Sequence, residues 1–194
     1  MTKKRVAILI SGRGSNMRAL IEAASEADYP AEIVLVLSNV ADASGLAYAR
    51  ERGIPTAVIE HKGYASREAF DQAMDETLAA AQAEIVALAG FMRLLSTAFA
   101  QKWRGRMINI HPSLLPAYKG LHTHKRAIAA GEKFAGCTVH FVTPELDDGP
   151  AILQAKVPVL PGDTEDTLAA RVLLEEHRIY PQALRLVAEG KAKI

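Results

Sequence analysis

The chain has 194 residues, of which 49% are hydrophobic and 23% are charged, and its formal net charge at pH 7 is +1. This composition is typical of a soluble globular protein and excludes a disordered or collagen-like chain. The basic residues are scattered rather than gathered in a stripe, which argues against a dedicated nucleic-acid binder. Lys3–Arg5 are expected to form a solvated arm ahead of the first strand.

A single cysteine, Cys137, excludes an intramolecular disulfide and fits a reducing compartment. No apolar run approaches the roughly 20 residues of a membrane span. The apolar stretch 6–10 is too short for a signal-peptide core, and a glycine loop follows it at once. We therefore expect a cytoplasmic protein.

Strand and helix patterns alternate through the first two-thirds of the chain. Continuous apolar runs ending in turn residues predict strands, and helical spacing of apolar residues predicts the helices between them. The predicted strands are 6–10, 33–37, 55–59, 85–89 and 107–110, and the predicted helices are 16–27, 44–52 and, from a Ser66 cap, 66–82. This alternation predicts an α/β fold: an open, mostly parallel, twisted sheet with helices on both faces.

The last third follows a different pattern. Residues 138–142 and 152–159 are predicted to form a late strand pair that extends the sheet. A helix is expected from about Thr164 to His177, and Pro181 is expected to open a separate helix that runs to Glu189. Ligands of such sheets bind outside the carboxyl ends of the strands, near the point where the strand order reverses. The loops after the first, fourth and fifth strands are therefore the places to search.

A glycine-containing loop, Ser11–Asn16, joins the first strand to the first helix. Glycines allow backbone amides to approach an anion, and a helix amino terminus adds partial positive charge. A dinucleotide fingerprint would need a third glycine where the chain has Met17, and no Gly-Lys-Ser/Thr pattern of a P-loop is present. The loop suits one phosphate, bound by amides and by Ser15 and Asn16. A simple tight turn would require the same glycines, so that alternative stays open.

Asn109 and His111 lie two residues apart at the end of a predicted strand, so their side chains face the same side. An amide donor beside an imidazole suits acyl transfer, in which negative charge develops on an oxygen. Histidine can also move protons near neutral pH. A purely structural His–Asn pair fits these residues equally well.

Asp147 and Asp148 occupy the loop between the two late strands. A carboxylate near His111 would favour its protonated form and orient the ring. Spacing alone does not say which aspartate faces His111, and acidic Gly-Pro turns are commonly only solvated.

Five strings of the sequence form a recognisable series: Ile10–Asn16, Leu88–Leu95, Asn109–Pro116, Gly120–His124 and Val139–Val142, the last followed by the Leu146–Pro150 turn. Together they resemble the glycinamide ribonucleotide formyltransferase family of folate-dependent enzymes, and they come in the family's order. The Asn-x-His-Pro-Ser-Leu-Leu-Pro string is specific to folate-dependent formyl transfer, and the resemblance runs from residue 6 to about 190. It implies one catalytic domain over 1–194 with a Rossmann-like formyltransferase fold.

The resemblance also implies site residues. Asn109, His111 and Asp147 match the catalytic positions of the family. The positions that match glycinamide ribonucleotide binding are Gly14, Ser15, Asn16 and Glu176, and those that match folate binding are Arg67, Met92, Arg93, Leu94, Leu95 and Asn109. Two residues depart from the pattern: Arg13 stands where some relatives have a small polar residue, and Lys119 where proline is common.

The implied reaction transfers a formyl group from the cosubstrate 10-formyltetrahydrofolate to the amine of glycinamide ribonucleotide, a step of purine biosynthesis, with no metal. Expected partners are small molecules, without nucleic acid or membrane, and the chain is expected to act as a monomer or homodimer. His122 and His124 form an H-x-H pair but have no further metal ligand at the usual spacing. His140 is expected to be a core histidine that could hydrogen-bond near the site, and Cys137 a packing residue.

Three alternatives remain. Formyltetrahydrofolate deformylase would use the same site with water as acceptor, but members of that family carry an additional amino-terminal domain. Methionyl-tRNA formyltransferase shares the catalytic string but has a carboxyl-terminal barrel and a basic surface, neither of which we expect here. A non-catalytic folate- or nucleotide-binding module is the third possibility.

Overall fold

Seven strands form one sheet in the computed structural model, which describes residues 2–194, and their order across the sheet is β3-β2-β1-β4-β5-β6-β7. The strands are β1 (Lys4–Ile10), β2 (Ala31–Ser38), β3 (Thr56–Val58), β4 (Ile85–Leu88), β5 (Met107–His111), β6 (Phe134–Phe141) and β7 (Ala151–Pro158). The helices are α1 (Ser15–Ala24), α2 (Gly45–Glu51), the short 3-10 helix η1 (His61–Gly63), α3 (Arg67–Ala80), α4 (Thr97–Lys102), α5 (Thr123–Ala129) and α6 (Glu165–Ala188).

The five strands β1–β5 are parallel, whereas β6 and β7 are antiparallel to their neighbours. This confirms the predicted sheet and its extension by a late strand pair. The chain order reverses between β1 and β4, which lie side by side with their carboxyl ends at the same edge. The loops after β1, β4 and β5 therefore meet near this edge.

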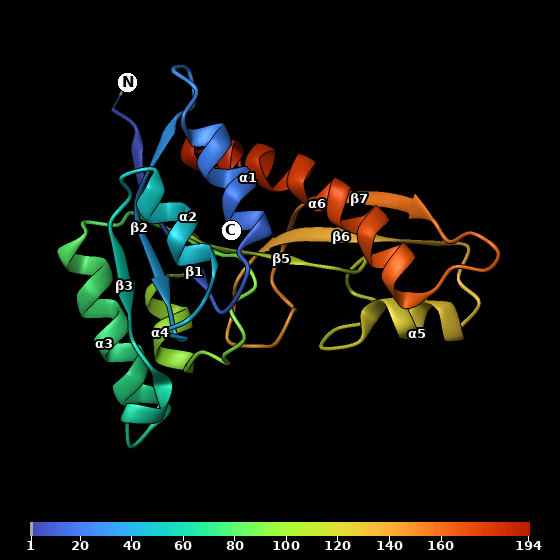
Figure 1. Cartoon of the computed structure of the whole chain (residues 1–194), viewed down its shortest axis with the longest axis horizontal. Coiled ribbons are helices and arrows are strands. Elements are labelled where there is room, and N and C mark those ends of the chain that lie inside the picture. Colours follow the sequence, from blue (N-terminus) through green and yellow to red (C-terminus); the bar gives the residue numbers. More distant parts are fainter. Residues whose placement is uncertain (1) are drawn as a thin grey trace.

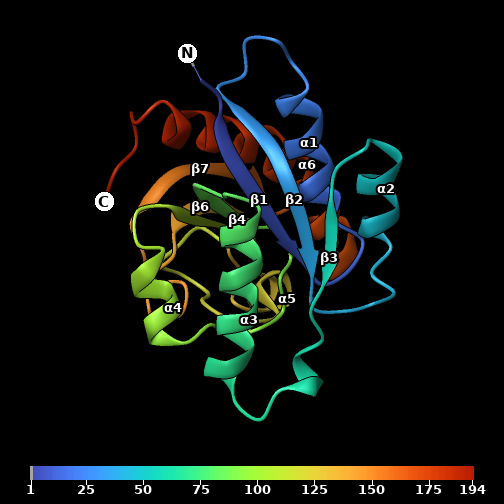
Figure 2. The same ribbon diagram turned by 90° about the vertical axis from the view of Figure 1, so that its left-hand side faces the viewer.

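Helices cover both faces of the sheet (Figure 1). Val6, Ile8 and Ile10 of β1 pack in one apolar cluster with α1, α2 and α6, while Ala7 and Leu9 pack in another with α3 and α4. Figure 2 shows α3 and α4 on the side nearer the viewer and α1 and α6 behind the strands. The continuous apolar run of β1 thus reflects burial on both faces.

The carboxyl-terminal helix corrects one prediction: α6 is a single helix from Glu165 to Ala188, with Pro181 inside it. Proline removes one backbone hydrogen bond from a helix interior. Both halves nevertheless bury the same face against the sheet, through residues such as Val172, Ile179 and Leu184. This shared burial outweighs the local cost of the proline, so the helix does not divide.

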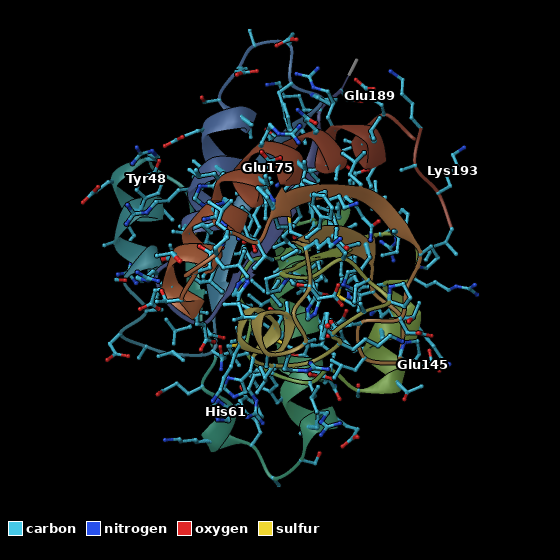
Figure 3. The ribbon with its side chains drawn as sticks, turned by 90° about the vertical axis from the view of Figure 1, so that its right-hand side faces the viewer. Tyr48, His61, Glu145, Glu175, Glu189 and Lys193 are labelled. Atoms are coloured by element: carbon cyan, nitrogen blue, oxygen red, sulfur yellow. The ribbon has the colours of Figure 1, made fainter. Side chains whose placement is uncertain are left out.

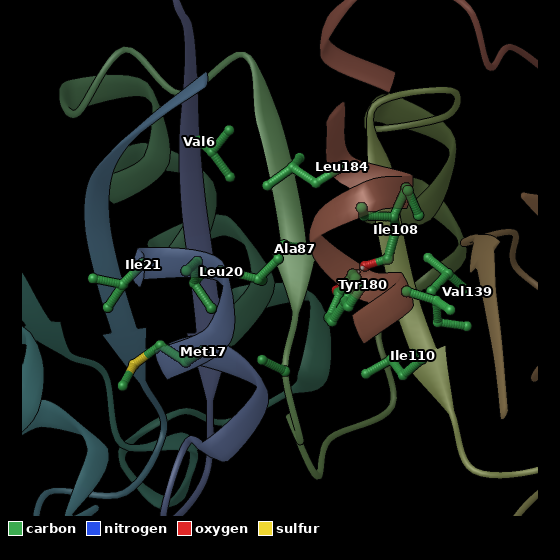
Figure 4. Packing of buried hydrophobic residues seen from close by; sticks show 14 of the residues in the cluster. Val6, Met17, Leu20, Ile21, Ala87, Ile108, Ile110, Val139, Tyr180 and Leu184 are labelled. Atoms are coloured by element: carbon green, nitrogen blue, oxygen red, sulfur yellow. Dashed lines mark hydrogen bonds between the residues drawn. The ribbon is translucent and has the colours of Figure 1, made fainter. Parts of the chain in front are cut away.

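Tyr180 anchors α6 to the middle of the sheet. Its hydroxyl is fully buried and donates to the backbone oxygen of Leu88 at 2.7 Å. The backbone oxygen of Ile108, a residue beside Tyr180 in Figure 4, lies 3.3 Å from the same hydroxyl. Burial raises the pKa of Tyr180 well above its ordinary value of 10.0. The phenol therefore stays a donor and fixes α6 relative to β4 and β5.

Three short helices were not predicted from the sequence: the 3-10 helix η1, of three residues, and α4 and α5, of six and seven residues. The Ser66 cap of α3 is confirmed, since its side chain accepts from the Ala69 amide, and Ser96 caps α4 in the same way. Helix α1 ends at Ala24, three residues before its predicted end. Within residues 2–194, no helix combines the length and the apolar character needed to cross a membrane.

Candidate active site

The glycine loop turns sharply into α1 at the carboxyl end of β1. Gly14 has φ 67° and ψ 39°, a left-handed conformation that glycine adopts readily. A Cβ atom at this position would come within 2.9 Å of the Met17 side chain. The backbone amides that follow Gly14 open a helix, which is the geometry of an anion site.

Asn16 and Glu176 form a buried polar pair beside this loop. The Asn16 Nδ2 donates to the Glu176 Oε2 at 2.7 Å, which joins α1 to α6. Burial raises the pKa of Glu176 above its ordinary value of 4.5, although the hydrogen bond from Asn16 acts in the opposite direction. The Asn16 Oδ1 is buried without a hydrogen-bond partner in the described chain, so it remains free to accept from a ligand.

Asn109 and His140 face each other across the β5–β6 ladder. The His140 Nδ1 donates to the backbone oxygen of Phe141 at 2.8 Å, so the Nε2 of the neutral ring accepts from the Asn109 Nδ2 at 3.2 Å. Burial lowers the pKa of His140 below its ordinary value of 6.5, although the hydrogen bond to Phe141 and the charge of Asp147 act in the opposite direction. The lowered pKa favours the neutral ring. His140 thus orients the Asn109 amide and leaves its second N–H for a ligand.

His111 pairs with Asp147 at the end of β5. The His111 Nδ1 lies 3.4 Å from the Asp147 Oδ2, and both side chains are less than 10% exposed. The Asp147 carboxylate also accepts from the Gly120 amide at 2.9 Å and lies 3.9 Å from the His140 Nε2. The Nε2 of His111 donates to the backbone oxygen of Tyr118 at 3.0 Å.

The structure distinguishes the two neighbouring aspartates. Asp147 has a left-handed backbone with φ 50° and directs its carboxylate to His111, whereas Asp148 is exposed and pairs with Lys119. Lys119 therefore forms an ion pair between two loops rather than pointing freely into solvent. Arg13 is exposed and makes no ion pair within residues 2–194.

The segment 91–95 follows β4 and exposes two large apolar side chains. Met92 is 66% exposed and Leu94 is 55% exposed, while Leu95 is half-buried. The segment is held at both ends: the Met92 amide donates to the Ser11 Oγ at 2.7 Å, and the Ser96 amide donates to the buried Asp71 at 2.6 Å. This arrangement leaves an apolar surface beside the glycine loop.

Arg67 and Arg93 are exposed and form no hydrogen bond or ion pair within the described residues. Arg67 is the first residue of α3, and within residues 2–194 no hydrogen bond or ion pair joins its side chain to the 91–95 segment. Of the residues that the resemblance implies, the structure brings together Asn109, His111 and Asp147, and separately Asn16 and Glu176. His61 follows β3 in the chain and lies at the lower edge of the molecule in Figure 3. The strands β1 and β2 point toward the lower edge of the molecule in Figure 2.

Three contacts of the site were not predicted from the sequence. These are the His140 bond to Asn109, the Tyr118 carbonyl on His111 and the Gly120 amide on Asp147. An antiparallel register of β5 and β6 could have placed His140 opposite Asn109, but the loop contacts carry no side-chain signal. Cys137 is buried, and burial raises the pKa of its thiol to about 12, as suits a packing residue.

The H-x-H pair lies at the start of α5. His122 is exposed, and His124 is half-buried with its pKa lowered by burial. In the part of the chain that the structure describes, no three His, Cys, Asp or Glu side chains are arranged to hold a metal ion.

Residues 4–184 match the family model described as formyl transferase. The phosphoribosylglycinamide formyltransferase of Escherichia coli is 48% identical over 189 residues, which cover 97% of this chain and 89% of that protein. The trifunctional purine biosynthetic protein adenosine-3 of Bos taurus is 54% identical over 99% of this chain, but the chain spans only 19% of that protein.

A solved structure of phosphoribosylglycinamide formyltransferase from Brucella melitensis superimposes with a TM-score of 0.93 at 56% identity, covering 96% of each chain. The sequence resemblance and the fold thus lead to the same result. The chain belongs to the formyl transferase family.

Proposed function

We propose that this protein transfers the formyl group of 10-formyltetrahydrofolate to the amine of glycinamide ribonucleotide, a step of purine biosynthesis. The observation that carries the proposal is the cluster of Asn109, His111 and Asp147 at the same sheet edge as the glycine loop that opens α1. The matched relatives named phosphoribosylglycinamide formyltransferase support it. Residues 1–194 act as one catalytic domain, in a reducing cytoplasmic compartment.

The ribonucleotide binds at the glycine loop. Its phosphate is bound by the amides that open α1, with Gly14, Ser15 and Asn16 closest to it. Glu176 of α6 and the free Oδ1 of Asn16 in α1 provide buried acceptors where the two helices meet. Hydroxyl or amine groups of a sugar–glycinamide ligand are suitable donors to them.

The folate binds along the 91–95 segment. A flat pterin ring is largely apolar with polar edges, so it suits the exposed Met92 and Leu94 side chains and the backbone groups between them. The unpaired guanidinium groups of Arg67 and Arg93 supply positive charge for the carboxylates of its glutamate tail.

The reaction begins when the amine nitrogen attacks the formyl carbon and a new C–N bond forms. Negative charge develops on the formyl oxygen, where the free N–H of Asn109 donates and the His111 imidazolium adds positive charge. Asp147 stabilises that imidazolium and accepts a proton from the amine, directly or through a water molecule. The bond to the folate nitrogen then breaks, and this nitrogen takes a proton as tetrahydrofolate leaves.

Neither ATP nor a covalent nucleophile is needed for this sequence. Alignment of two bound substrates contributes about 7–11 kcal/mol to such reactions when the geometry is right. The loops after β1, β4 and β5 meet at one edge and provide that alignment.

The decisive experiment measures tetrahydrofolate release by the purified protein, with and without glycinamide ribonucleotide. We expect release only with the ribonucleotide, no stimulation by ATP and no formylation of methionyl-tRNA. Equal release with and without the ribonucleotide would instead identify a deformylase. Tight folate binding without any turnover would identify a binding module.

A further inference from the structure

The segment Tyr118–His122, which we call the bracket, contacts both members of the His111–Asp147 pair. The Tyr118 carbonyl accepts from the His111 Nε2 at 3.0 Å, and the Gly120 amide donates to the Asp147 Oδ2 at 2.9 Å. With Nε2 bound in this way, the Nδ1 of His111 is turned toward Asp147. The bracket therefore fixes the orientation of the ring and of the carboxylate at the same time.

Arg126 of α5 contacts the bracket through hydrogen bonds and through an aromatic ring. One of its guanidinium nitrogens, Nη1, donates to the backbone oxygens of Lys119, at 2.7 Å, and of Leu121, at 3.2 Å. Its Cζ lies 5.2 Å from the centre of the Tyr118 ring, whose hydroxyl donates to Glu132 at 2.8 Å. A single side chain thus contacts three of the five bracket residues.

The bracket needs such support because its backbone is strained. Tyr118 has φ 55° and His122 has φ 56°, values in the left-handed region that side chains other than glycine rarely adopt. Residues in this region persist only where their surroundings hold them. Two of the four such residues of the described chain lie in the bracket, and a third is Asp147 itself.

Packing around Tyr118 is incomplete: a pocket of about 80 Å³ lies beside it, and Ser113, Tyr118, His124 and Glu132 are among the residues that line this pocket. Lys119 of the bracket also pairs with Asp148, but this ion pair is exposed, so solvent weakens it. Arg126 therefore supplies the side-chain hydrogen bonds that join the Lys119 and Leu121 carbonyls of the bracket to α5.

We infer that Arg126 is a positioning residue for formyl transfer, acting through the bracket on the His111–Asp147 pair. This inference rests on the proposed function. The guanidinium suits the role because its planar donors bind carbonyl oxygens while its face stacks on an aromatic ring. The charged or titratable groups that face His111 are Asp147, His140 and His124. None of them would be replaced in the test.

The test compares Arg126→Ala with Arg106→Ala. Arg106 is a matched control because it also stacks on an aromatic ring, Trp103, and donates to a backbone oxygen, that of Lys102. It precedes the amino end of β5, whereas Asn109 and His111 lie toward the carboxyl end. We expect kcat of Arg126→Ala to fall roughly tenfold, since small misplacements of catalytic groups are costly. KM for both substrates should stay within about twofold.

Two further readouts separate positioning from general destabilisation. The limb of the pH–rate profile that requires an imidazolium should move to lower pH in Arg126→Ala, because the ring loses an acceptor. Hydrogen exchange of the Gly120 amide should accelerate in this variant and stay unchanged in Arg106→Ala. Arg126→Lys, which keeps the charge and one donor but not the planar stack, should recover part of kcat; it also replaces Arg126→Ala if that variant folds poorly.

An unchanged kcat and pH profile in Arg126→Ala, with unchanged Gly120 exchange, would overturn the inference. A kcat above that of the wild type would overturn it as well, because the Tyr118 carbonyl would then be masking His111 rather than orienting it. If the wild-type protein transfers no formyl group, the proposed function fails, but Gly120 exchange still reports whether Arg126 holds the bracket.

Discussion

Replacing Asp147 by Asn keeps the shape of the side chain and removes its charge. The amide oxygen can still accept from Gly120, so the loop should stay in place. Two unit charges 3.4 Å apart attract by about 5 kcal/mol at an effective dielectric constant of about 20. Because an amide still presents a partial negative charge, about 3 to 4 kcal/mol of stabilisation should be lost in a transition state that contains the His111 imidazolium.

That loss corresponds to a fall in kcat of about 10²- to 10³-fold, since about 1.4 kcal/mol equals a factor of ten. Steady-state release of tetrahydrofolate at saturating substrates measures kcat, and titration of both substrates checks that binding is retained. Asp148→Asn is the matched control, because Asp148 pairs with Lys119 in solvent and should lose less than about threefold. Near-normal kcat in Asp147→Asn, or equal losses in the two variants, would refute the assigned role of Asp147.

Three other substitutions test separate parts of the site. Gly14→Val should raise KM for the ribonucleotide strongly and leave folate binding nearly unchanged, because a branched side chain enters the glycine loop at φ 67°. The control Gly53→Val, at φ 69°, carries the same backbone strain elsewhere and should leave KM unchanged, so equal KM values in the two variants would contradict a phosphate-binding loop. Asn109→Ala should lower kcat by about 10²- to 10³-fold because an oxyanion donor is lost. The double variant with His111→Ala should lose far less kcat than the product of the two single losses, and a loss equal to that product would show that the two residues act separately. Glu176→Gln should raise Tm relative to the wild type above pH 4.5, because burial raises the pKa of Glu176 and its ionisation therefore opposes folding there. Thermal unfolding across pH should show the Tm difference between the two proteins vanish below pH 4.5, and a Tm difference that does not depend on pH would contradict this explanation.

The positions of the buried parallel strands could be predicted because their residues are apolar in continuous runs, whereas their order across the sheet could not. Val6–Ile10 is buried on both faces and reads as a strand without any tertiary information. The helices α4 and α5 were missed because six or seven residues give too little periodicity to be recognised. Pro181 misled in the opposite direction: its local preference predicts a break, but burial of the whole α6 face decides the structure.

The candidate site shows the same division. The Asn109–His111 spacing predicts a shared face, and the structure places both at the carboxyl end of β5. The choice between Asp147 and Asp148 depends on the left-handed backbone at Asp147, which sequence spacing does not encode. His140 lies in an apolar strand, which predicts a core histidine that could hydrogen-bond near the site. Its partner, Asn109, is identified only by the β5–β6 register that brings the two residues opposite each other.

The contact of Tyr180 with the sheet bears on how the protein is made. Ribosomes synthesise α6 after every strand, so a nascent chain that ends at β7 already contains the glycine loop, Asn109, His111 and Asp147. It still lacks Glu176 and Tyr180, which lie one turn apart and close the site and the core together. Until α6 emerges, the sheet face that it covers stays exposed, and such surfaces favour aggregation or chaperone binding. A pause in translation before residue 176 should therefore yield a chain that contains Asn109, His111 and Asp147 but has no catalytic activity.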